Sequence, residues 1–455
     1  MEEAAQAMIM VGKIIERLAL PVAGILLALI AGLIASALIR RVIRRRKAGV
    51  LDALGEVCGP LIEARASGRT DREADEELRQ AIAKAWNVCE GLGLVNVWRR
   101  RLADRDSGSL FKRLFSRNYS LMERLHPFRF VLRAEAAENL GTIRHQPSWP
   151  LLVEALRDPY LAVASTAARA LAAIREPQSV PALAERLKAA ALNPATEVSA
   201  RALVMALANF PPATSVTLQS LLLHPHSRVR FLATDVIAVM LRQEASRAGV
   251  KSGTGLRASL PPEVAEIALT RLAVDEDADV RARAADVAGY LEDPRALSAI
   301  LALLADGEWF VRLHAVRAIA HQRLMPLAAV RGRLTDPHWR VREASAQTLC
   351  AQGRLGVDCM LDHFLNTDDC YSQEQVAEQL VRSGWLPSLV ASFGMAGRER
   401  ETRFVEGIVR LGKGAALIPV LRSALPPAKR EMLLKSFWSH PDPMVHSFAE
   451  ACVSG

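Results

Sequence analysis

One short pattern recurs along most of this chain at a nearly constant interval. An acidic or capping residue is followed five positions later by Val or another apolar residue, often by Arg, and then by small apolar residues. The apolar starts of the copies are Leu132, Val163, Val198, Val229, Val280, Val311, Val341 and Gln373, at intervals of 30 to 35 residues except for one of 51 before Val280. Such a period predicts a solenoid, because each unit buries its apolar face only by stacking on its neighbours.

Each repeat is expected to be a helical hairpin. Within a copy the apolar positions fall at i, i+4, i+7 and i+8, which is one stripe of an α-helix. Asp158 and Asp336 each precede a proline, and a capping side chain before proline marks a helix start, since the first turn needs no proline N–H. A small residue in mid-helix, such as Ala284, lets the next helix approach closely. A second amphipathic run, for example 297–304, precedes each cap, so the unit reads as helix A, turn, helix B.

The pattern Asp-x4-Val-Arg-x2-Ala-x3-Leu/Ile, with its proline-led first helices, resembles the bacterial HEAT-like repeat first noted in bilin lyases. The resemblance covers residues 126–455 and is clearest from 158 to 350. It implies an all-α fold, a right-handed α-solenoid whose B helices line the concave face. Repeats of this kind serve scaffolds, adaptors, transport receptors, lyases and a class of DNA glycosylases, so the fold alone does not select a function.

A membrane segment is predicted near the start of the chain. Residues 18–39 carry no charge, and these 22 residues, at about 1.5 Å each, suffice to cross a hydrocarbon core of roughly 30 Å. A basic cluster follows directly: Arg40, Arg41, Arg44, Arg45, Arg46 and Lys47. Because a basic flank stays in the cytosol, residues 1–17 are expected outside the cytoplasm and the solenoid inside it, on a single-pass protein of the inner (plasma) membrane.

Two alternatives to this anchor are a signal peptide and a buried helix or hairpin. In a signal peptide the basic region precedes the apolar run, whereas here it follows. The formal net charge is +9, and residues 1–50 hold eight Lys or Arg against three Asp or Glu. The rest of the chain is therefore only weakly basic, and nucleic-acid binding is not predicted. Six cysteines without a framework spacing suit a reducing compartment.

Two segments depart from the repeat. Residues 40–125 are predicted to form a basic juxtamembrane and helical cap region, with a charged helix over 70–85 and a basic one over 110–125. A basic helix of this kind lying on the anionic bilayer surface is the alternative. Residues from about 245 to 262 are Gly/Ser-rich and exceed the repeat period, so they are predicted to bulge as an insertion loop.

The Asp and Arg of the pattern suggest a structural ladder. The Arg that follows the apolar start recurs as Arg230, Arg281, Arg312 and Arg342. We predict that each Asp caps helix B and that stacked Asp and Arg side chains pair between repeats, setting register more than stability. A basic binding stripe is the alternative.

Aromatic residues recur two positions before the apolar start. They are Phe130, Trp309, Trp339 and Tyr371. Trp309 and Trp339 each have an Arg three residues later, on the same helix face. Aromatic rings beside guanidinium groups are typical of protein-binding hot spots. We therefore predict a partner-binding strip on the concave face, made of Trp309, Arg312, Trp339, Arg342 and Tyr371. The alternative is that the aromatic rings fill gaps between repeats.

Catalytic chemistry is not indicated. Cys359, His363 and Cys370 match no established zinc spacing, and we predict no catalytic residue, metal site, cofactor or small-molecule substrate. The repeat histidines are interpreted as ordinary helix residues: His314, His321 and His338. The chain is expected to be a scaffold or adaptor, not an enzyme, that binds a membrane-associated protein partner as a subunit of an inner-membrane enzyme or export complex. The alternatives are a solenoid enzyme of bilin-lyase or DNA-glycosylase type and a nucleic-acid-binding protein.

Overall fold

In the computed structural model of this chain, the described residues are 72–91, 93–103, 129–193, 199–247, 260–322, 325–423 and 425–454. Across these ranges the regular structure is helical and contains no strand. The chain divides into two compact units. The first contains residues up to Arg100 together with Ile143–His145, and the second contains Arg101–Thr142 and Gln146–Gly455.

The predicted membrane anchor lies outside the described residues, as do residues 1–17 before it and the basic cluster from Arg40 to Lys47 after it. None of the helices that the structure describes combines the length and the apolar character that a bilayer crossing requires.

The first unit contains α2 (Arg72–Gly91) and most of α3 (Leu94–Ala103). Gly93 joins them with a φ of +68°, a left-handed conformation that glycine adopts without steric cost. Cys89, Val95 and Trp98 are buried in this unit. Helix α2 confirms the charged helix predicted over 70–85 and extends it, whereas the basic helix predicted over 110–125 lies outside the described residues.

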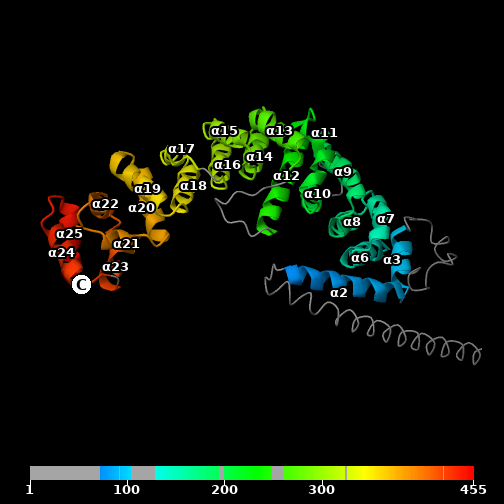
Figure 1. Cartoon of the computed structure of the whole chain (residues 1–455), viewed down its shortest axis with the longest axis horizontal. Coiled ribbons are helices and arrows are strands. Elements are labelled where there is room, and N and C mark those ends of the chain that lie inside the picture. The colour runs from blue at the N-terminus through cyan, green and yellow to red at the C-terminus, as the bar shows by residue number, and fades with distance from the viewer. Residues whose placement is uncertain are drawn as a thin grey trace, which may run out of the picture. The chain divides into compact units, whose positions relative to one another are not determined.

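The second unit is a series of tandem helical hairpins (Figure 1). The B helices are α6 (Arg129–Thr142), α8 (Leu161–Ile174), α10 (Ala200–Leu207), α12 (Ser227–Arg247), α14 (Ala278–Gly289), α16 (Trp309–Ile319), α18 (Trp339–Cys350) and α20 (Cys370–Arg382). The A helices between them are α7 (Trp149–Ala155), α9 (Val180–Leu192), α11 (Gln219–Leu222), α13 (Pro262–Thr270), α15 (Pro294–Leu303), α17 (Leu327–Arg331) and α19 (Arg354–Asn366). Consecutive B helices from α6 to α20 pack on each other, and from α8 onward each B helix also packs on the A helix of its own hairpin. This confirms the solenoid stacking, while the right-handed superhelix stays a prediction.

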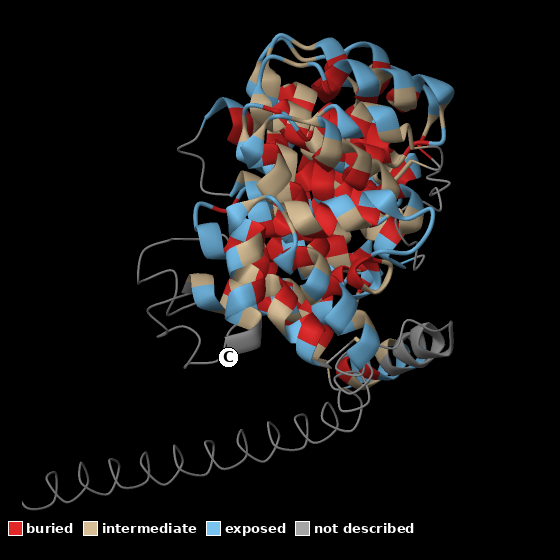
Figure 2. Ribbon diagram, turned by 90° about the vertical axis from the view of Figure 1, so that its left-hand side faces the viewer, coloured by how far each residue is buried: buried red, intermediate tan, exposed pale blue. Residues whose placement is uncertain are grey.

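The repeating apolar stripe forms a continuous core along the stacked hairpins, as the buried residues in Figure 2 show. Val280, Val311 and Val341 are fully buried at equivalent places. Small residues set the spacing between B helices: a Cβ added at Gly289 of α14 would stand 2.9 Å from the Cα of Ala318 on α16. Neighbouring B helices thus touch through backbone atoms, which fixes their separation.

The last hairpin of the regular series is shifted by one residue from the predicted register. Ser372, not Gln373, is the buried residue of α20 at the place of Val341. The reason is the choice of cap: the carboxylate of Asp369 accepts hydrogen bonds from the backbone N–H groups of Tyr371 and Ser372, so the helix begins at Cys370. Tyr371 therefore stands one residue after the place that Trp339 occupies in α18.

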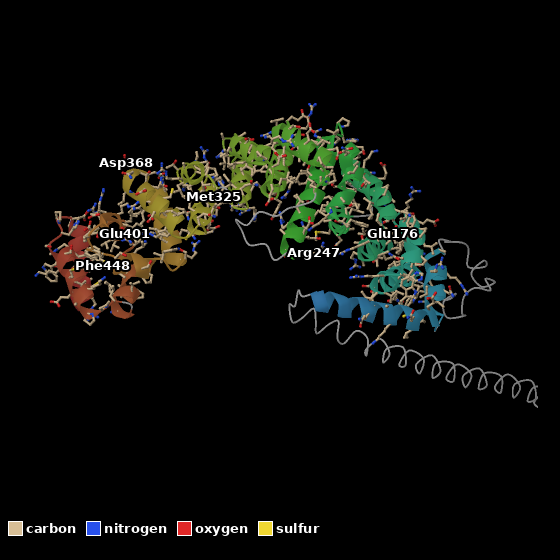
Figure 3. The ribbon with its side chains drawn as sticks, in the orientation of Figure 1. Glu176, Arg247, Met325, Asp368, Glu401 and Phe448 are labelled. Atoms are coloured by element: carbon tan, nitrogen blue, oxygen red, sulfur yellow. The ribbon has the colours of Figure 1, made fainter. Side chains whose placement is uncertain are left out.

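The stacking changes after α20. The remaining helices are α21 (Leu386–Ala391), α22 (Glu399–Arg410), α23 (Ile418–Ser423), α24 (Pro427–Trp438) and α25 (Pro443–Ser454). Helix α22 packs on α19, where Gly407 leaves room for the ring of Phe364. The buried start position of α22 is occupied by Glu401, labelled in Figure 3, whose carboxylate is paired with Arg354 and Arg398.

The long interval between Val229 and Val280 begins with a long helix. Helix α12 has 21 residues, against 12 in α14, and it ends at Arg247, the residue labelled in Figure 3. Residues 245–247, predicted as the beginning of the insertion loop, are thus helical, because the chain continues the helix beyond the apolar core. Residues 248–259 lie outside the described part of the chain.

Candidate partner-binding surface

Four arginines of the B helices pair with an aspartate of a following repeat. The Nε–Oδ2 distances are 2.8 Å for Arg133–Asp158 and 2.7 Å for Arg230–Asp275, Arg281–Asp306 and Arg312–Asp336. In every pair Nη2 also donates to Oδ1, so each contact is bidentate. The predicted ladder between repeats is present in the structure.

The guanidinium groups of Arg230, Arg281 and Arg312 also bind their own repeats. Nη1 of Arg312 donates to the backbone carbonyls of Asp306 and Gly307, at 2.8 and 3.0 Å. The ladder aspartate in turn accepts from a backbone N–H two residues ahead, as Asp336 does from His338 at 2.9 Å. The prediction that this Asp caps helix B is therefore wrong in detail. Asp336 instead stabilises the turn before the helix. The N-cap is His338, whose Nδ1 accepts from the N–H of Arg340.

The pairs also explain why the pKa values of Asp306 and Asp336 are lowered. Burial alone would raise the pKa of Asp336, but the hydrogen bonds from Arg312 and from the His338 N–H outweigh it and hold the pKa below its ordinary 3.8. Asp306 shows the same balance with Arg281. The hydrogen bond to Asp336 raises the pKa of Arg312. Arg312 is therefore engaged within the fold, although it was predicted to belong to the binding strip.

The ladder stops at Arg342. Its Nη1 donates to the carbonyls of Asp336 and Pro337, as in the other rungs, but its Nε is buried without a hydrogen-bond partner. The place of the next aspartate is taken by Thr367, whose Oγ1 accepts from the N–H of Asp369, two residues ahead, just as Asp336 accepts from His338. A hydroxyl offers no carboxylate for the guanidinium fork.

Aromatic rings cluster at the start of α16 and α18. The ring of Trp309 stacks on that of His338 with centroids 3.8 Å apart. The guanidinium of Arg340 lies over both Trp309 and Trp339, at 5.6 and 5.3 Å from the ring centroids. The same arrangement occurs in an earlier repeat. There Phe130, at the place of Trp309, stacks on Tyr160, at the place of His338. Trp309 therefore fills a gap between repeats, as the alternative interpretation predicted.

Trp339 is different because the next repeat has no aromatic ring at the place of His338. In the next repeat the residue at the place of His338 is Asp369, whose carboxylate is used as the helix cap. Trp339 is 52% exposed and Tyr371 is 67% exposed. The ring of Tyr371 lies 6.0 Å from the guanidinium carbon of Arg342. Of the predicted strip, Trp339 and Tyr371 are therefore exposed, and Arg342 is partly buried beside Tyr371.

Sequence reasoning missed His338 and Arg340. His338 was interpreted as an ordinary helix residue, although it follows Asp336-Pro337 and so stands where a cap is expected. The residue before the apolar start is not part of the repeat pattern, although Arg228 precedes Val229 as Arg340 precedes Val341. The contacts of Arg340 depend on two rings from different repeats. We name the group of Trp339, Arg340, Arg342 and Tyr371 the aromatic–arginine patch; Arg342 is its one partly buried member.

A second polar cluster joins three B helices on another face. His314 of α16 and Arg283 of α14 each lie 2.8 Å from a carboxylate oxygen of Asp286, and Arg283 reaches Asp235 of α12 at 3.2 Å. Burial opposes ionisation of Asp286, yet the hydrogen bond from His314 and the charges around it lower its pKa. Every carboxylate here faces a cation, so the cluster links α12, α14 and α16 and does not indicate a catalytic centre.

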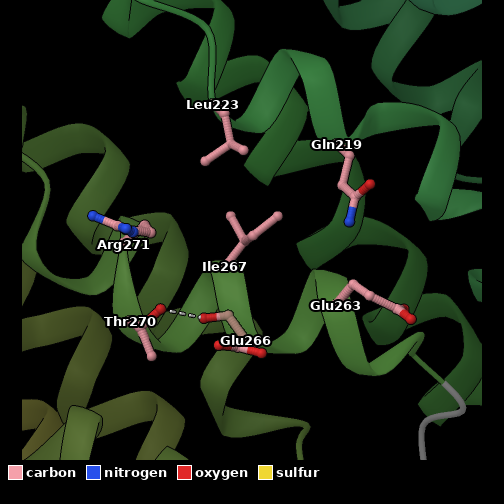
Figure 4. A pocket seen from close by; sticks show the side chains of 7 residues that line it. All are labelled: Gln219, Leu223, Glu263, Glu266, Ile267, Thr270 and Arg271. Atoms are coloured by element: carbon pink, nitrogen blue, oxygen red, sulfur yellow. Dashed lines mark hydrogen bonds between the residues drawn. The ribbon is translucent and has the colours of Figure 1, made fainter.

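Small-molecule and metal sites have little support in the described residues. A cavity of about 450 Å³ lies between α11 and α13, lined by Gln219, Leu223, Glu263, Glu266, Ile267, Thr270 and Arg271 (Figure 4). The Thr270 hydroxyl is used within its own helix, where it donates to the Glu266 carbonyl. Among the described residues no three His, Cys, Asp or Glu side chains are grouped as metal ligands, and Nε2 of His363 lies 2.7 Å from the Ser372 hydroxyl.

Comparison with known proteins agrees with the repeat architecture. A family model for HEAT repeats matches residues 120–203 and 265–350. No curated protein matches the chain. These two stretches are HEAT repeats, whereas the kinship with bilin lyases stays a prediction.

Several solved structures are similar at low identity. An engineered protein is 18% identical, with a TM-score of 0.29, and the match covers 76% of this chain and 97% of that one. Kap121p bound to RanGTP is 16% identical, with a TM-score of 0.40 and coverage of 87% and 48%. Kap95p, solved with RanGDP, is 13% identical, with a TM-score of 0.39 and coverage of 90% and 55%. The chain thus spans about half the length of the two Kap proteins.

Proposed function

We propose that this chain is a membrane-anchored scaffold whose cytoplasmic HEAT-repeat solenoid binds a protein partner, as a subunit of an inner-membrane enzyme or export complex. The observation that carries the proposal is the aromatic–arginine patch. A half-exposed Trp beside one guanidinium and an exposed Tyr beside another is the composition of a binding hot spot, and the group lies at the starts of two helices.

The anchor belongs to the same proposal. The uncharged run 18–39 and the basic cluster after it would hold the solenoid beside the bilayer. Tethering converts the search for a membrane partner into a local one, and the effective concentration of a tethered site reaches the millimolar range for short linkers. A solenoid surface of modest affinity is then sufficient.

Affinity purification from detergent-solubilised membranes tests this function. The intact chain is compared with a chain lacking residues 1–47, and co-purified proteins are identified by mass spectrometry. A partner retained by both chains places recognition in the solenoid, as we expect. If the shortened chain captures nothing that the intact chain captures, recognition lies in the bilayer segment and the solenoid proposal fails.

Two tryptophan variants separate binding from packing. Trp339→Ala removes an exposed ring, so we expect partner capture to fall by tenfold or more with little change in melting temperature. Trp309→Ala removes a ring that stacks on His338, so we expect the melting temperature to fall. Loss of capture only in proportion to loss of folding, in both variants, would show that the aromatic rings are structural.

The enzyme alternative has one observation to consider, the cluster of Asp235, Arg283, Asp286 and His314. Its carboxylates are neutralised by the cations that bridge the helices, so the cluster is explained by packing. The scaffold therefore remains the function that the geometry favours, and we propose no reaction.

A further inference from the structure

The end of the arginine–aspartate ladder is an incomplete binding site for a carboxylate. In the four complete rungs the Nε and Nη2 edge of the arginine holds a carboxylate from a following repeat. In the fifth, Arg342 is held by the same two carbonyl contacts, so its orientation is that of a rung. Its buried Nε has no partner, because Thr367 stands where the aspartate would be.

The repeat that contains Thr367 has no arginine at the ladder position. Gln373 of α20 occupies the place of the ladder arginine and donates through Nε2 to the carbonyls of Phe364 and Thr367, at 3.0 and 2.9 Å. A glutamine therefore satisfies the turn without presenting a guanidinium fork. The chain retains Arg at 342, where the fork is left open, and an unpaired buried donor is costly.

We propose that Arg342 is an open rung that binds an Asp or Glu side chain of a partner, in an extended acidic segment whose apolar neighbours pack on Trp339 and Tyr371. This rests on the proposed scaffold function and specifies the chemistry of the partner. The partner carboxylate would complete the ladder by accepting from the Nε and Nη2 edge of Arg342, as Asp336 accepts from that of Arg312. Charge complementarity supports an acidic segment, since Arg340 adds a second cation beside Trp339.

The experiment selects peptides on the full-length chain in detergent micelles. A displayed library of random twelve-residue peptides is selected on the unaltered chain, on Arg342→Gln and on Arg317→Gln. Arg342→Gln should keep a contact to the Asp336 carbonyl, as Gln373 keeps the equivalent one to the Thr367 carbonyl, while removing the fork. Arg317 is an exposed residue of α16, so Arg317→Gln is a control for the loss of one charge.

We expect the unaltered chain and Arg317→Gln to enrich peptides with Asp or Glu next to apolar residues, and Arg342→Gln to lose this enrichment. An enriched peptide, synthesised with an amidated end, should bind at least tenfold more weakly to Arg342→Gln and when its acids are replaced by Asn or Gln. Binding that requires the free terminal carboxylate instead, or enrichment without acidic residues, would overturn the proposal. So would the absence of any enrichment.

A second variant closes the rung from within the chain. Thr367→Asp supplies the missing carboxylate, so it should abolish binding of the acidic peptide, while Thr367→Asn should not. Thr367→Asp should also stabilise the chain more when Arg342 is present than in an Arg342→Gln background. If Thr367→Asp leaves peptide binding unchanged, or its effect on melting temperature is independent of Arg342, the open rung is refuted.

The two proposals fail separately. If membrane partners are lost with Trp339→Ala but kept with both Arg342→Gln and Thr367→Asp, the scaffold function stands and the carboxylate site is wrong. If the acidic peptides bind as expected but no partner co-purifies with the solenoid, the carboxylate site stands and the scaffold function fails.

Discussion

Breaking one rung should cost far more than breaking an exposed ion pair of the same length. The carboxylate of Asp336 is fully buried and Arg312 is 12% exposed, with Nε and Oδ2 2.7 Å apart. Lys413 and Glu378 are also 2.7 Å apart, but their side chains are 35% and 46% exposed. Distance is thus matched between the two pairs, and burial differs.

Asp336→Ala removes three hydrogen bonds together. Two come from Arg312, at 2.7 and 2.8 Å, and one from the N–H of His338, at 2.9 Å. The variant leaves a largely buried guanidinium without its counter-charge, and removing one partner of a buried pair costs about 3–5 kcal/mol. Lys413→Ala removes a pair screened by water, so its cost should stay below about 1 kcal/mol.

The free energy of unfolding is to be measured in urea, since guanidinium chloride would screen the ion pairs themselves. Hydrogen exchange should localise the loss to α16 and α18, because a solenoid repeat contacts only its neighbours. The double variant Arg312→Ala/Asp336→Ala should cost less than the sum of the single variants. If Asp336→Ala costs no more than Lys413→Ala, or the two ladder substitutions are additive, then the rung does not couple the repeats and this reasoning fails.

Two further predictions concern acid and packing. The pKa values of Asp306 and Asp336 lie below 3.8 in the folded chain. Their contribution to stability is therefore complete above pH 3.8 and is lost as the pH falls through the lowered values. Asp336→Ala should flatten this acid dependence of the melting temperature. Gly289→Ala should lower the melting temperature, since the new Cβ would stand 2.9 Å from the Cα of Ala318, whereas Gly307→Ala, where nothing lies within 4 Å, should not; equal effects would contradict the close approach of α14 and α16.

The fold was predictable because its causes are local and repeated. The burial of Val280, Val311 and Val341 follows from helical periodicity, and the ladder follows from an Asp and an Arg that recur with them. What the pattern could not supply is which of two adjacent caps a helix uses. The pattern put Asp368 at the place of Asp336, which would make Cys370 the N-cap. The structure has Thr367 at that place and caps the helix with Asp369, so α20 begins one residue earlier. Cap choice depends on the geometry of the preceding turn, not on residue type.

The surface was less predictable because it depends on contacts between repeats. Trp309 and Trp339 are identical in the sequence pattern, yet one is stacked and the other is half exposed. The difference lies in the cap of the following repeat, which is His338 for the first and Asp369 for the second. A pattern defined within one repeat does not show which residue of the next repeat covers the ring, so both tryptophans were assigned to the same strip. Arg340 was missed for the same reason.

The incomplete rung and the exposed tryptophan have one common origin. Both lie at the junction between α18 and α20, and both result from the residues that begin the last regular repeat. Thr367 has no carboxylate to pair with Arg342, and Asp369 has no ring to cover Trp339. A repeat with Asp and His at these places, as in Asp336 and His338, would close both contacts. The junction therefore places a guanidinium without a carboxylate partner next to an uncovered ring. A partner segment with an acidic residue beside an apolar one supplies both missing groups, which is why the junction, and not the complete ladder before it, is the surface to test.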